Sequence, residues 1–306
     1  MKKDILTLLD LRLEDCERLF PRALQLKRRH DKGVSESALA GRTLGLLFDK
    51  ASTRTRLAFS AAMSKMGGTS LFIQSGETQM SRNEPLRDTA RVMSRYLDMI
   101  AIRTYSQEWV ERFAGYTDIP VINALTDSFH PTQVLSDLMT VVEKKGDFKG
   151  LKYAWVGDGN NMANSWINAA AVMGLDLFLS CPEGYTPDAG ILETAKAAAV
   201  NPEGIRLVSD PREAVADADV VNTDVWAGMG QEEKLEGRKR IFAPYQLNAE
   251  LMQHARADAI VLHCLPAHRG EEITDDVLEG PSSVVWDQAE NKMHMAKAIL
   301  EALIEG

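Results

Sequence analysis

The segment Ser52-Thr-Arg-Thr-Arg56 alternates hydroxyl and guanidinium side chains, a combination suited to binding an anion. It follows an apolar run over 43–48, short enough to be a buried strand, and leads into a predicted helix over 56–65. The first N–H groups of a helix have no partner inside it and lie at the positive end of its dipole. Phosphate is the most natural ligand for such a site. A Ser/Thr helix cap with solvent-facing arginines is the alternative, although one capping residue would suffice for that role.

Polar residues also follow most of the other predicted strands. In open α/β sheets, ligands bind beyond the carboxyl ends of the strands. The polar residues at those positions are Arg103, His130, Asn160, Asn161, Asp224, His263 and Cys264. Their common placement carries more weight than any single motif, and it predicts a ligand site along this edge of the sheet.

Each of three short motifs has both a chemical and a structural interpretation. His130-Pro-Thr-Gln133 places a His and a Gln one turn apart at a predicted helix start, where they could hold a carbonyl or cap the helix. Asp224, before the glycine-rich segment ending at Gly230, could receive an ammonium group or precede an ordinary loop. His263-Cys-Leu-Pro266 could supply a nucleophile, a metal ligand or a polar wall. Buried lone cysteines are usually inert, and a single Cys argues against zinc.

The segment Gly157-Asp-Gly-Asn-Asn-Met162 imitates a dinucleotide-binding fingerprint. Its third glycine is replaced by Met162, and the next predicted strand ends at Leu179-Ser-Cys without an acidic residue clearly placed for a ribose. Nucleotide binding is therefore the weaker interpretation. The two asparagines could instead offer amide groups to a small polar ligand, or form a Gly-Asn turn before a helix.

Strands and helices are predicted to alternate along the chain, which indicates parallel sheets. The predicted strands cover 43–48, 69–73, 99–103, 121–123, 153–157, 175–179, 205–208, 219–222, 259–264 and 283–286. The predicted helices cover 13–31, 56–65, 86–96, 107–115, 130–145, 161–173, 191–200, 212–217, 248–255 and 288–305. Pro21 suggests a kink in the first helix or a later start, and polar segments are expected over 74–85 and 227–240. A break at Lys145–Gly150 predicts two α/β domains, 1–147 and 148–287.

Composition excludes several classes of protein. The 306 residues, 45% of them hydrophobic, suffice for two domains or one large one. A formal net charge of −9 without a Lys/Arg stripe argues against nucleic-acid binding, and no apolar run approaches membrane-spanning length. The apolar run within Met1–Asp10 is too short for a signal peptide. Cys16, Cys181 and Cys264 are odd in number and far apart, so a reduced, cytoplasmic protein without a disulfide framework is expected.

Taken together, the motifs resemble those of the ornithine carbamoyltransferases, within the aspartate/ornithine carbamoyltransferase family. The matching segments are Ser52–Arg56, Asp88–Arg91, His130–Gln133, Asp158–Asn161, Asp224–Trp226, Met229–Glu232 and His263–Pro266, in the family's order. The resemblance covers nearly the whole chain. The first and third of these motifs are typical of carbamoyltransferases in general, whereas Met229–Glu232 and His263–Pro266 point to the ornithine branch.

This resemblance implies a fold, an activity and a set of partners. Each of the two domains would be a parallel α/β sheet flanked by helices, and the C-terminal helix (288–306) would pack back on the first domain. The reaction would transfer the carbamoyl group of carbamoyl phosphate to the side-chain amine of L-ornithine, giving citrulline and phosphate. A homotrimer, or an assembly of trimers, would form active sites between subunits. The resemblance implies no metal, no cofactor, and no nucleic-acid or membrane partner.

The resemblance also implies roles for individual residues. Carbamoyl phosphate would be bound by Ser52, Thr53, Arg54, Thr55, Gln79 of a neighbouring subunit, Arg103, His130, Gln133, Cys264, Leu265 and Lys292. Ornithine would be bound by Asn161, Asp224, Gly228 and Met229. The catalytic set would be Arg54, Thr55, Arg103, His130, Asp224 and Cys264.

Three positions depart from the family's usual pattern. Gly228 stands where the family has Ser, which removes a hydroxyl and keeps a backbone N–H. Lys292 stands where the family has Arg, which keeps the charge and loses the fork of donors. Ser60 stands where the family often has Glu. The acceptor could therefore be another amine, such as putrescine or an acylated ornithine. A non-catalytic carbamoyl phosphate-binding protein is a second alternative, and a nicotinamide oxidoreductase is the weakest.

Overall fold

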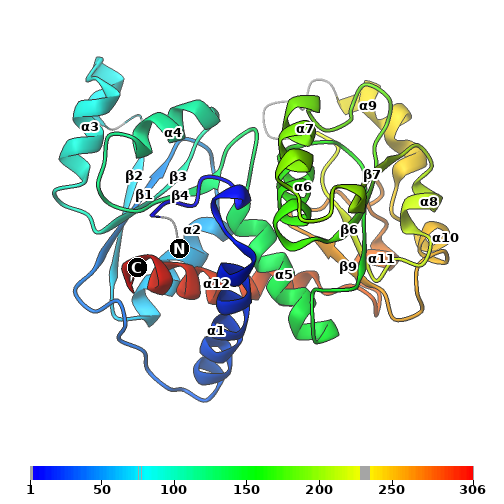
Figure 1. Cartoon of the computed structure of the whole chain (residues 1–306), viewed down its shortest axis with the longest axis horizontal. Coiled ribbons are helices and arrows are strands. Elements are labelled where there is room, and N and C mark those ends of the chain that lie inside the picture. Colours follow the sequence, from blue (N-terminus) through cyan, green and yellow to red (C-terminus); the bar gives the residue numbers. More distant parts are fainter. Residues whose placement is uncertain (1–2, 75, 77, 228–234, 306) are drawn as a thin grey trace. The chain divides into compact units, whose positions relative to one another are not determined.

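The computed structural model describes residues 3–74, 76, 78–227 and 235–305, and the chain forms two compact α/β units (Figure 1). Unit 1 comprises residues 1–139 and 290–306, and unit 2 comprises residues 140–289. Within the described ranges, no helix has the length and hydrophobicity needed to cross a membrane.

Unit 1 is built on a four-stranded parallel sheet of order β2-β1-β3-β4. Its strands are β1 (Thr43–Phe48), β2 (Thr69–Gln74), β3 (Met99–Arg103) and β4 (Val121–Leu125). Its helices are α1 (Leu13–Asp31), α2 (Arg54–Lys65), α3 (Leu86–Met93) and α4 (Gln107–Ala114), with short 3₁₀ helices η1 (Leu8–Asp10) and η3 (Gln79–Arg82). Two further helices, α5 (Pro131–Lys145) and α12 (Val285–Glu305), contribute residues to both units.

Unit 2 is built on a five-stranded parallel sheet of order β7-β6-β5-β8-β9. Its strands are β5 (Lys152–Val156), β6 (Asp176–Ser180), β7 (Ile205–Val208), β8 (Val220–Thr223) and β9 (Ile260–His263). Its helices are α6 (Asn161–Met173), α7 (Ala189–Ala198), α8 (Pro211–Val215), α9 (Leu235–Phe242), α10 (Ala249–Met252) and α11 (Asp275–Leu278), with η4 (Pro202–Gly204) and η6 (Ala243–Tyr245). The predicted fold class, two parallel sheets flanked by helices, is therefore confirmed.

The C-terminal helix packs back on unit 1, as predicted. The Arg22 guanidinium of α1 donates through Nε and Nη2 to the two carboxylate oxygens of Glu301 on α12, at 2.6 and 2.7 Å. Lys27 of α1 donates to Asn291 Oδ1 at 2.9 Å in a buried contact. A bidentate guanidinium–carboxylate pair fixes both distance and orientation, so the last helix is held on the first.

Strand register brings the predicted site residues to one edge of each sheet. In unit 1, Phe48 of β1 pairs with Arg103 of β3, which in turn pairs with Leu125 of β4. In unit 2, Thr223 of β8 pairs with His263 of β9. Because these residues end their strands, the segments that follow them leave each sheet at the same edge.

Four local predictions require correction. The predicted strand over 283–286 is a single bridge between Val261 and Ser283, and α12 begins at Val285 instead of 288. Pro21 lies inside α1, which begins at Leu13 and not later. The polar segments over 74–85 and 227–240 contain η3 and the start of α9. The Val284-Val285 pair that suggested a strand is buried at a helix start, and β-propensity reports a side chain's fit to a buried surface more than a backbone preference.

A buried basic cluster lies where the last helix meets α1. His294 is fully buried, and neither of its ring nitrogens has a hydrogen-bond partner among the described residues. Its ring centroid is 5.5 Å from that of His30, and Lys297 and Lys27 are also buried. Burial, followed by the charges of Lys297, Lys27, His30 and Lys65, lowers the pKa of His294 to about 3. His294 is therefore neutral in the folded protein at neutral pH.

We predict that His294 makes the fold sensitive to acid. A histidine with a folded pKa of about 3 and an unfolded value of about 6.5 binds more protons when unfolded, so stability falls as pH drops from about 6.5 toward 3. In urea unfolding at pH 7, 6, 5 and 4, His294→Gln should flatten this decline, whereas His254→Gln, at an exposed position, should not. An equally steep decline in His294→Gln would contradict the assignment.

Candidate active site

The start of α2 offers hydrogen-bond donors that its capping residue leaves unused. Thr53 is the N-cap, yet it has helical backbone angles (φ −86°, ψ −59°) and makes no side-chain capping bond. The first turn of α2 contains no acidic side chain. Thr55 is buried, Ser52 and Arg54 are half-buried, and Thr53 is exposed. The simple capping interpretation therefore fails for Thr53, and a helix start without an acidic side chain is compatible with a bound anion.

A buried polar network links α2, α5 and α12. Lys292 of α12 donates through Nζ to Gln133 Oε1, and to Thr55 Oγ1 at 3.4 Å. Gln133 in turn donates through Nε2 to Asp137 Oδ1 at 2.7 Å. All four side chains are at least nine-tenths buried. The Lys292 ammonium is thus held beside the first turn of α2.

Arg103 and His130 complete the half-site in unit 1. Arg103 ends β3 and is buried, and its carbonyl accepts from Asp49 N at 2.8 Å. His130 precedes α5, is buried, and its Nδ1 lies 3.5 Å from Thr132 Oγ1. Burial, and then the positive charges of Lys292 and Arg103, hold the pKa of His130 well below 6.5. A neutral imidazole between two cations can serve as a hydrogen-bonding group without adding charge.

The residues just before Ser52 are also engaged at this edge of the sheet. Lys50 Nζ forms an ion pair with Asp127 and lies 4.3 Å from the centre of the Tyr105 ring. Thr104 donates to the carboxylate of Asp49. These contacts connect the segment after β1 to the segments after β3 and β4. Sequence analysis missed Lys50, although its position two residues before Ser52 was an available signal.

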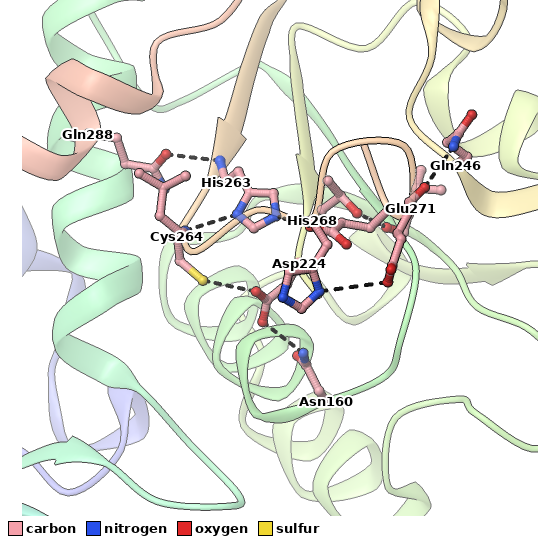
Figure 2. Close-up of polar contacts among 12 residues, drawn as sticks. Asn160, Asp224, Gln246, His263, Cys264, His268, Glu271 and Gln288 are labelled. Atoms are coloured by element: carbon pink, nitrogen blue, oxygen red, sulfur yellow. Dashed lines mark hydrogen bonds and ion pairs between the residues drawn. The ribbon is translucent and has the colours of Figure 1, made fainter. Parts of the chain in front are cut away.

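In unit 2, Asp224 is held between an amide and a thiol (Figure 2). It lies directly after β8 and is buried. Asn160 Nδ2 donates to Asp224 Oδ2 at 2.8 Å, and Cys264 Sγ donates to Asp224 Oδ1 at 3.1 Å. The structure therefore brings together Asp224 and Cys264, both predicted site residues, and adds Asn160 as the residue that orients the carboxylate.

His263 fixes the turn that carries Cys264. Its backbone N–H donates to Gln288 Oε1 at 2.9 Å, and its ring Nδ1 accepts from Leu265 N at 2.9 Å. Because Nδ1 accepts, the proton is on Nε2, which donates to Glu272 Oε1 at 3.0 Å. Leu265 has a φ of 58°, a left-handed conformation that a non-glycine residue adopts only when its surroundings hold it there. Figure 2 shows these contacts converging on the turn.

The glycine-rich turn after β5 is explained by packing. A Cβ on Gly159 would lie 2.2 Å from Pro187 N, and the Gly159 amide already donates to Tyr185 O at 2.8 Å. Asn160 caps α6 by accepting from Met162 N and Ala163 N. The amides that would cradle a pyrophosphate in a dinucleotide fold therefore have protein partners at Gly159, Met162 and Ala163.

Two groups of possible metal ligands lie in the described part of unit 2. The first consists of Asp224, His263 and Cys264, and the second of His268, Glu271 and Glu272. In the first group, Asp224 and both ring nitrogens of His263 are engaged in the hydrogen bonds described above. In the second group, Lys239 Nζ lies 3.3 Å from Glu271 Oε1, so Glu271 already has a cationic partner. Hydrogen bonds within the protein therefore account for the arrangement of the first group.

The structure distributes the predicted site residues between the two units. Unit 1 contains Ser52, Thr53, Arg54, Thr55, Arg103, His130, Gln133 and Lys292, together with Gln79, which is exposed in η3. Unit 2 contains Asp224, Cys264, Leu265 and Asn161, the first residue of α6. Gly228 and Met229 lie outside the described residues. Sequence analysis missed Asp137, Glu272 and Gln288, which contact site residues without belonging to a motif.

Comparison with known protein families divides the chain between residues 143 and 149, and it includes Lys292 and α12 as far as residue 303 in the second domain. The model of the aspartate/ornithine carbamoyltransferase carbamoyl-P binding domain matches residues 3–143. The model of the Asp/Orn binding domain of the same family matches residues 149–303. One domain family therefore covers the residues around Ser52–Thr55, and the other covers those around Asp224 and Cys264.

Individual relatives are similar over nearly their full length. The ornithine carbamoyltransferase of Syntrophus aciditrophicus (strain SB) is 56% identical over 304 residues, covering 99% of this chain and 100% of the relative. Among solved structures, ornithine carbamoyltransferase from Pyrococcus furiosus is 47% identical with a TM-score of 0.94, covering 99% of this chain and 97% of that one. That from Thermus thermophilus is 39% identical with a TM-score of 0.89, covering 99% of both chains. With both family domains matched across it, this chain belongs to the aspartate/ornithine carbamoyltransferase family.

Proposed function

We propose that the protein transfers the carbamoyl group of carbamoyl phosphate to the side-chain amine of L-ornithine, giving L-citrulline and phosphate. It is a carbamoyltransferase, and the relatives described above are ornithine carbamoyltransferases. The single observation that carries the proposal is the uncapped start of α2, with Thr55 bonded to the Lys292 ammonium. Carbamoyl phosphate supplies the anion that this turn is built to receive.

Carbamoyl phosphate, the donor substrate, would bind in unit 1. Ser52, Thr53, Arg54 and Thr55 would hold the phosphate, and Gln79 of a neighbouring subunit would reach it. Arg103, His130, Gln133 and Lys292 would contact the carbamoyl group. Negative charge develops on the carbonyl oxygen during attack, and each preorganised donor there contributes about 3 kcal/mol. Burial keeps Arg103 and His130 away from bulk water, where such contacts would be weaker.

The acceptor would bind in unit 2. Asn161, Asp224, Gly228 and Met229 would hold the amino-acid end of ornithine, and Cys264 and Leu265 would line the reacting centre. The attacking amine must be neutral, although the pKa of a free alkylamine such as that of Lys is about 10.4. A water-poor site beside cations favours loss of its proton, and the departing phosphate can accept that proton. No metal or organic cofactor is needed for these steps.

We further propose the setting in which the enzyme works. The domains would be 1–147 with the helix 288–306, binding carbamoyl phosphate, and 148–287, binding ornithine. Gln79 is exposed in η3, as a residue reaching a neighbouring subunit would be, which supports a homotrimer or an assembly of trimers. None of the three cysteines forms a disulfide, which fits a reducing cytoplasm. Citrulline formation would serve arginine biosynthesis.

A panel of acceptors tests the substrate assignment. At fixed carbamoyl phosphate, phosphate release should be fastest with L-ornithine and at least tenfold slower with putrescine, an acylated ornithine or L-aspartate. The expected preference follows from Asp224, which would receive the ammonium group of the amino-acid end of ornithine. Equal or faster release with another acceptor would overturn the assignment to ornithine.

Arg54→Ala tests the phosphate site. Loss of a guanidinium at a developing anionic centre should lower kcat/KM by about 10²–10³-fold. Arg18→Ala is the matched control, because Arg18 is an exposed arginine of the same unit that pairs with Asp15. Steady-state kinetics of both variants provide the comparison. Near-normal activity of Arg54→Ala would remove Arg54 from the site.

Cys264→Ser separates a wall of the acceptor site from a covalent nucleophile. The thiol donates to Asp224 in the structure, a role that a hydroxyl can also fill. We therefore expect reduced but measurable turnover. Activity assays and intact-mass spectrometry of the wild type during turnover are the measurements. Complete loss of activity in the variant, together with a trappable thioester in the wild type, would contradict this role.

A further inference from the structure

Gln133 is held between a buried carboxylate and a buried ammonium. Gln133 and Asp137 are each 1% exposed, and Lys292 is 8% exposed. Both Gln133 and Asp137 lie on α5, four residues apart, so their side chains share one face of the helix. Gln133 Nε2 donates to Asp137 at 2.7 Å, and Gln133 Oε1 accepts from Lys292 Nζ.

The two ions allow only one orientation of the amide between them. An ionised carboxylate can only accept hydrogen bonds, and an ammonium can only donate them. If the Gln133 amide were reversed, its oxygen would face the carboxylate of Asp137 and its NH₂ group would face the ammonium of Lys292. Both contacts would then be repulsive in a site closed to water. Asp137 therefore determines which end of Gln133 meets Lys292.

The Lys292 ammonium also contacts the first turn of α2. Lys292 Nζ also donates to Thr55 Oγ1 at 3.4 Å, in the first turn of α2. A cavity of about 10 Å³, lined by Thr55, Thr132 and Lys292 among others, lies beside it. Space for about one water leaves one side of the Lys292 side chain loosely packed. The hydrogen bonds to Gln133 and Thr55 contribute to its placement at the anion-binding turn.

We propose that Asp137 is a positioning residue of the carbamoyl phosphate site, which acts through Gln133 to hold the Lys292 ammonium beside Thr55. The inference rests on the proposed function for the identity of the anion. Asp137 does not itself contact the substrate in this account. Its effect is to keep one donor of the site in a fixed place before the anion arrives.

The test is Asp137→Asn, which keeps the size of the side chain and an acceptor oxygen but adds an amide donor. Gln133 can then be held in either orientation, so the ammonium loses its fixed partner. We expect the KM for carbamoyl phosphate to rise about tenfold, as when one charge-assisted contact is misplaced, while the KM for ornithine changes less than twofold. In Lys292→Met, adding Asp137→Asn should change the carbamoyl phosphate KM less than twofold further.

Two controls separate positioning from simple destabilisation. Asp15→Asn alters another buried aspartate of unit 1, which accepts from Arg12 N at 3.0 Å, and should lower the urea midpoint without changing the carbamoyl phosphate KM. Asp137→Glu keeps an acceptor-only carboxylate and should stay within threefold of the wild type. Two results would overturn the proposal. One is a lowered urea midpoint with an unchanged carbamoyl phosphate KM in Asp137→Asn. The other is a rise in this KM, on adding Asp137→Asn to Lys292→Met, that is as large as in the wild type.

A second measurement distinguishes this inference from the proposed function. It is the rise in unfolding temperature that carbamoyl phosphate causes in the absence of any acceptor. A smaller rise in Asp137→Asn than in the wild type supports the positioning role even if ornithine is not carbamoylated. An equal rise in both proteins, with the wild type active on ornithine, overturns the positioning role alone.

Discussion

Helix α2 follows the buried strand β1 in the chain. The side chain of Thr53, its N-cap residue, does not cap the backbone N–H groups of its first turn. The positive end of a helix dipole favours a negative charge, and the first turn of α2 contains no acidic side chain. The surrounding side chains have the same preference, since Arg54 and Thr55 open the helix and Lys292 donates to Thr55. The rest of unit 1 serves to bring these donors to one edge of the sheet, through the pairing of Phe48 with Arg103 and of Arg103 with Leu125.

Burial and neighbouring charges together determine which side chains of this half-site are charged. Arg103 and Lys292 are buried cations, and together with burial they keep His130 uncharged by lowering its pKa. The buried carboxyl group of Asp137 is linked to Lys292 through the amide of Gln133. Buried donors that are already in place would suit the proposed phosphoryl ligand, because dipoles that are preorganised need not reorient when an anion binds.

Sequence alone predicted the elements whose patterns are local. β1, β3, β7 and α6 have the predicted bounds, because a short apolar run between turn residues, or an Asn cap before an apolar helix, determines each one. The strand predicted over 283–286 failed because Val284 and Val285 are buried by tertiary packing at the start of α12. The predicted break near Lys145–Gly150 is close to where α5 ends, but contacts assign the last turns of α5 to unit 2, which no composition change could reveal.

The same limit applies to the candidate site. Motif residues such as Arg54, His130, Asp224 and Cys264 could be found because their types and their positions after strands point to chemistry. Asp137, Glu272 and Gln288 could not, since each acts on a motif residue through a contact that only the fold creates. The most direct test of the central claim is a crystal structure with a stable phosphonate analogue of carbamoyl phosphate. The phosphonate oxygens should lie within hydrogen-bonding distance of the first amides of α2 and of Arg54. A phosphonate bound elsewhere, with the start of α2 open to solvent, would contradict it.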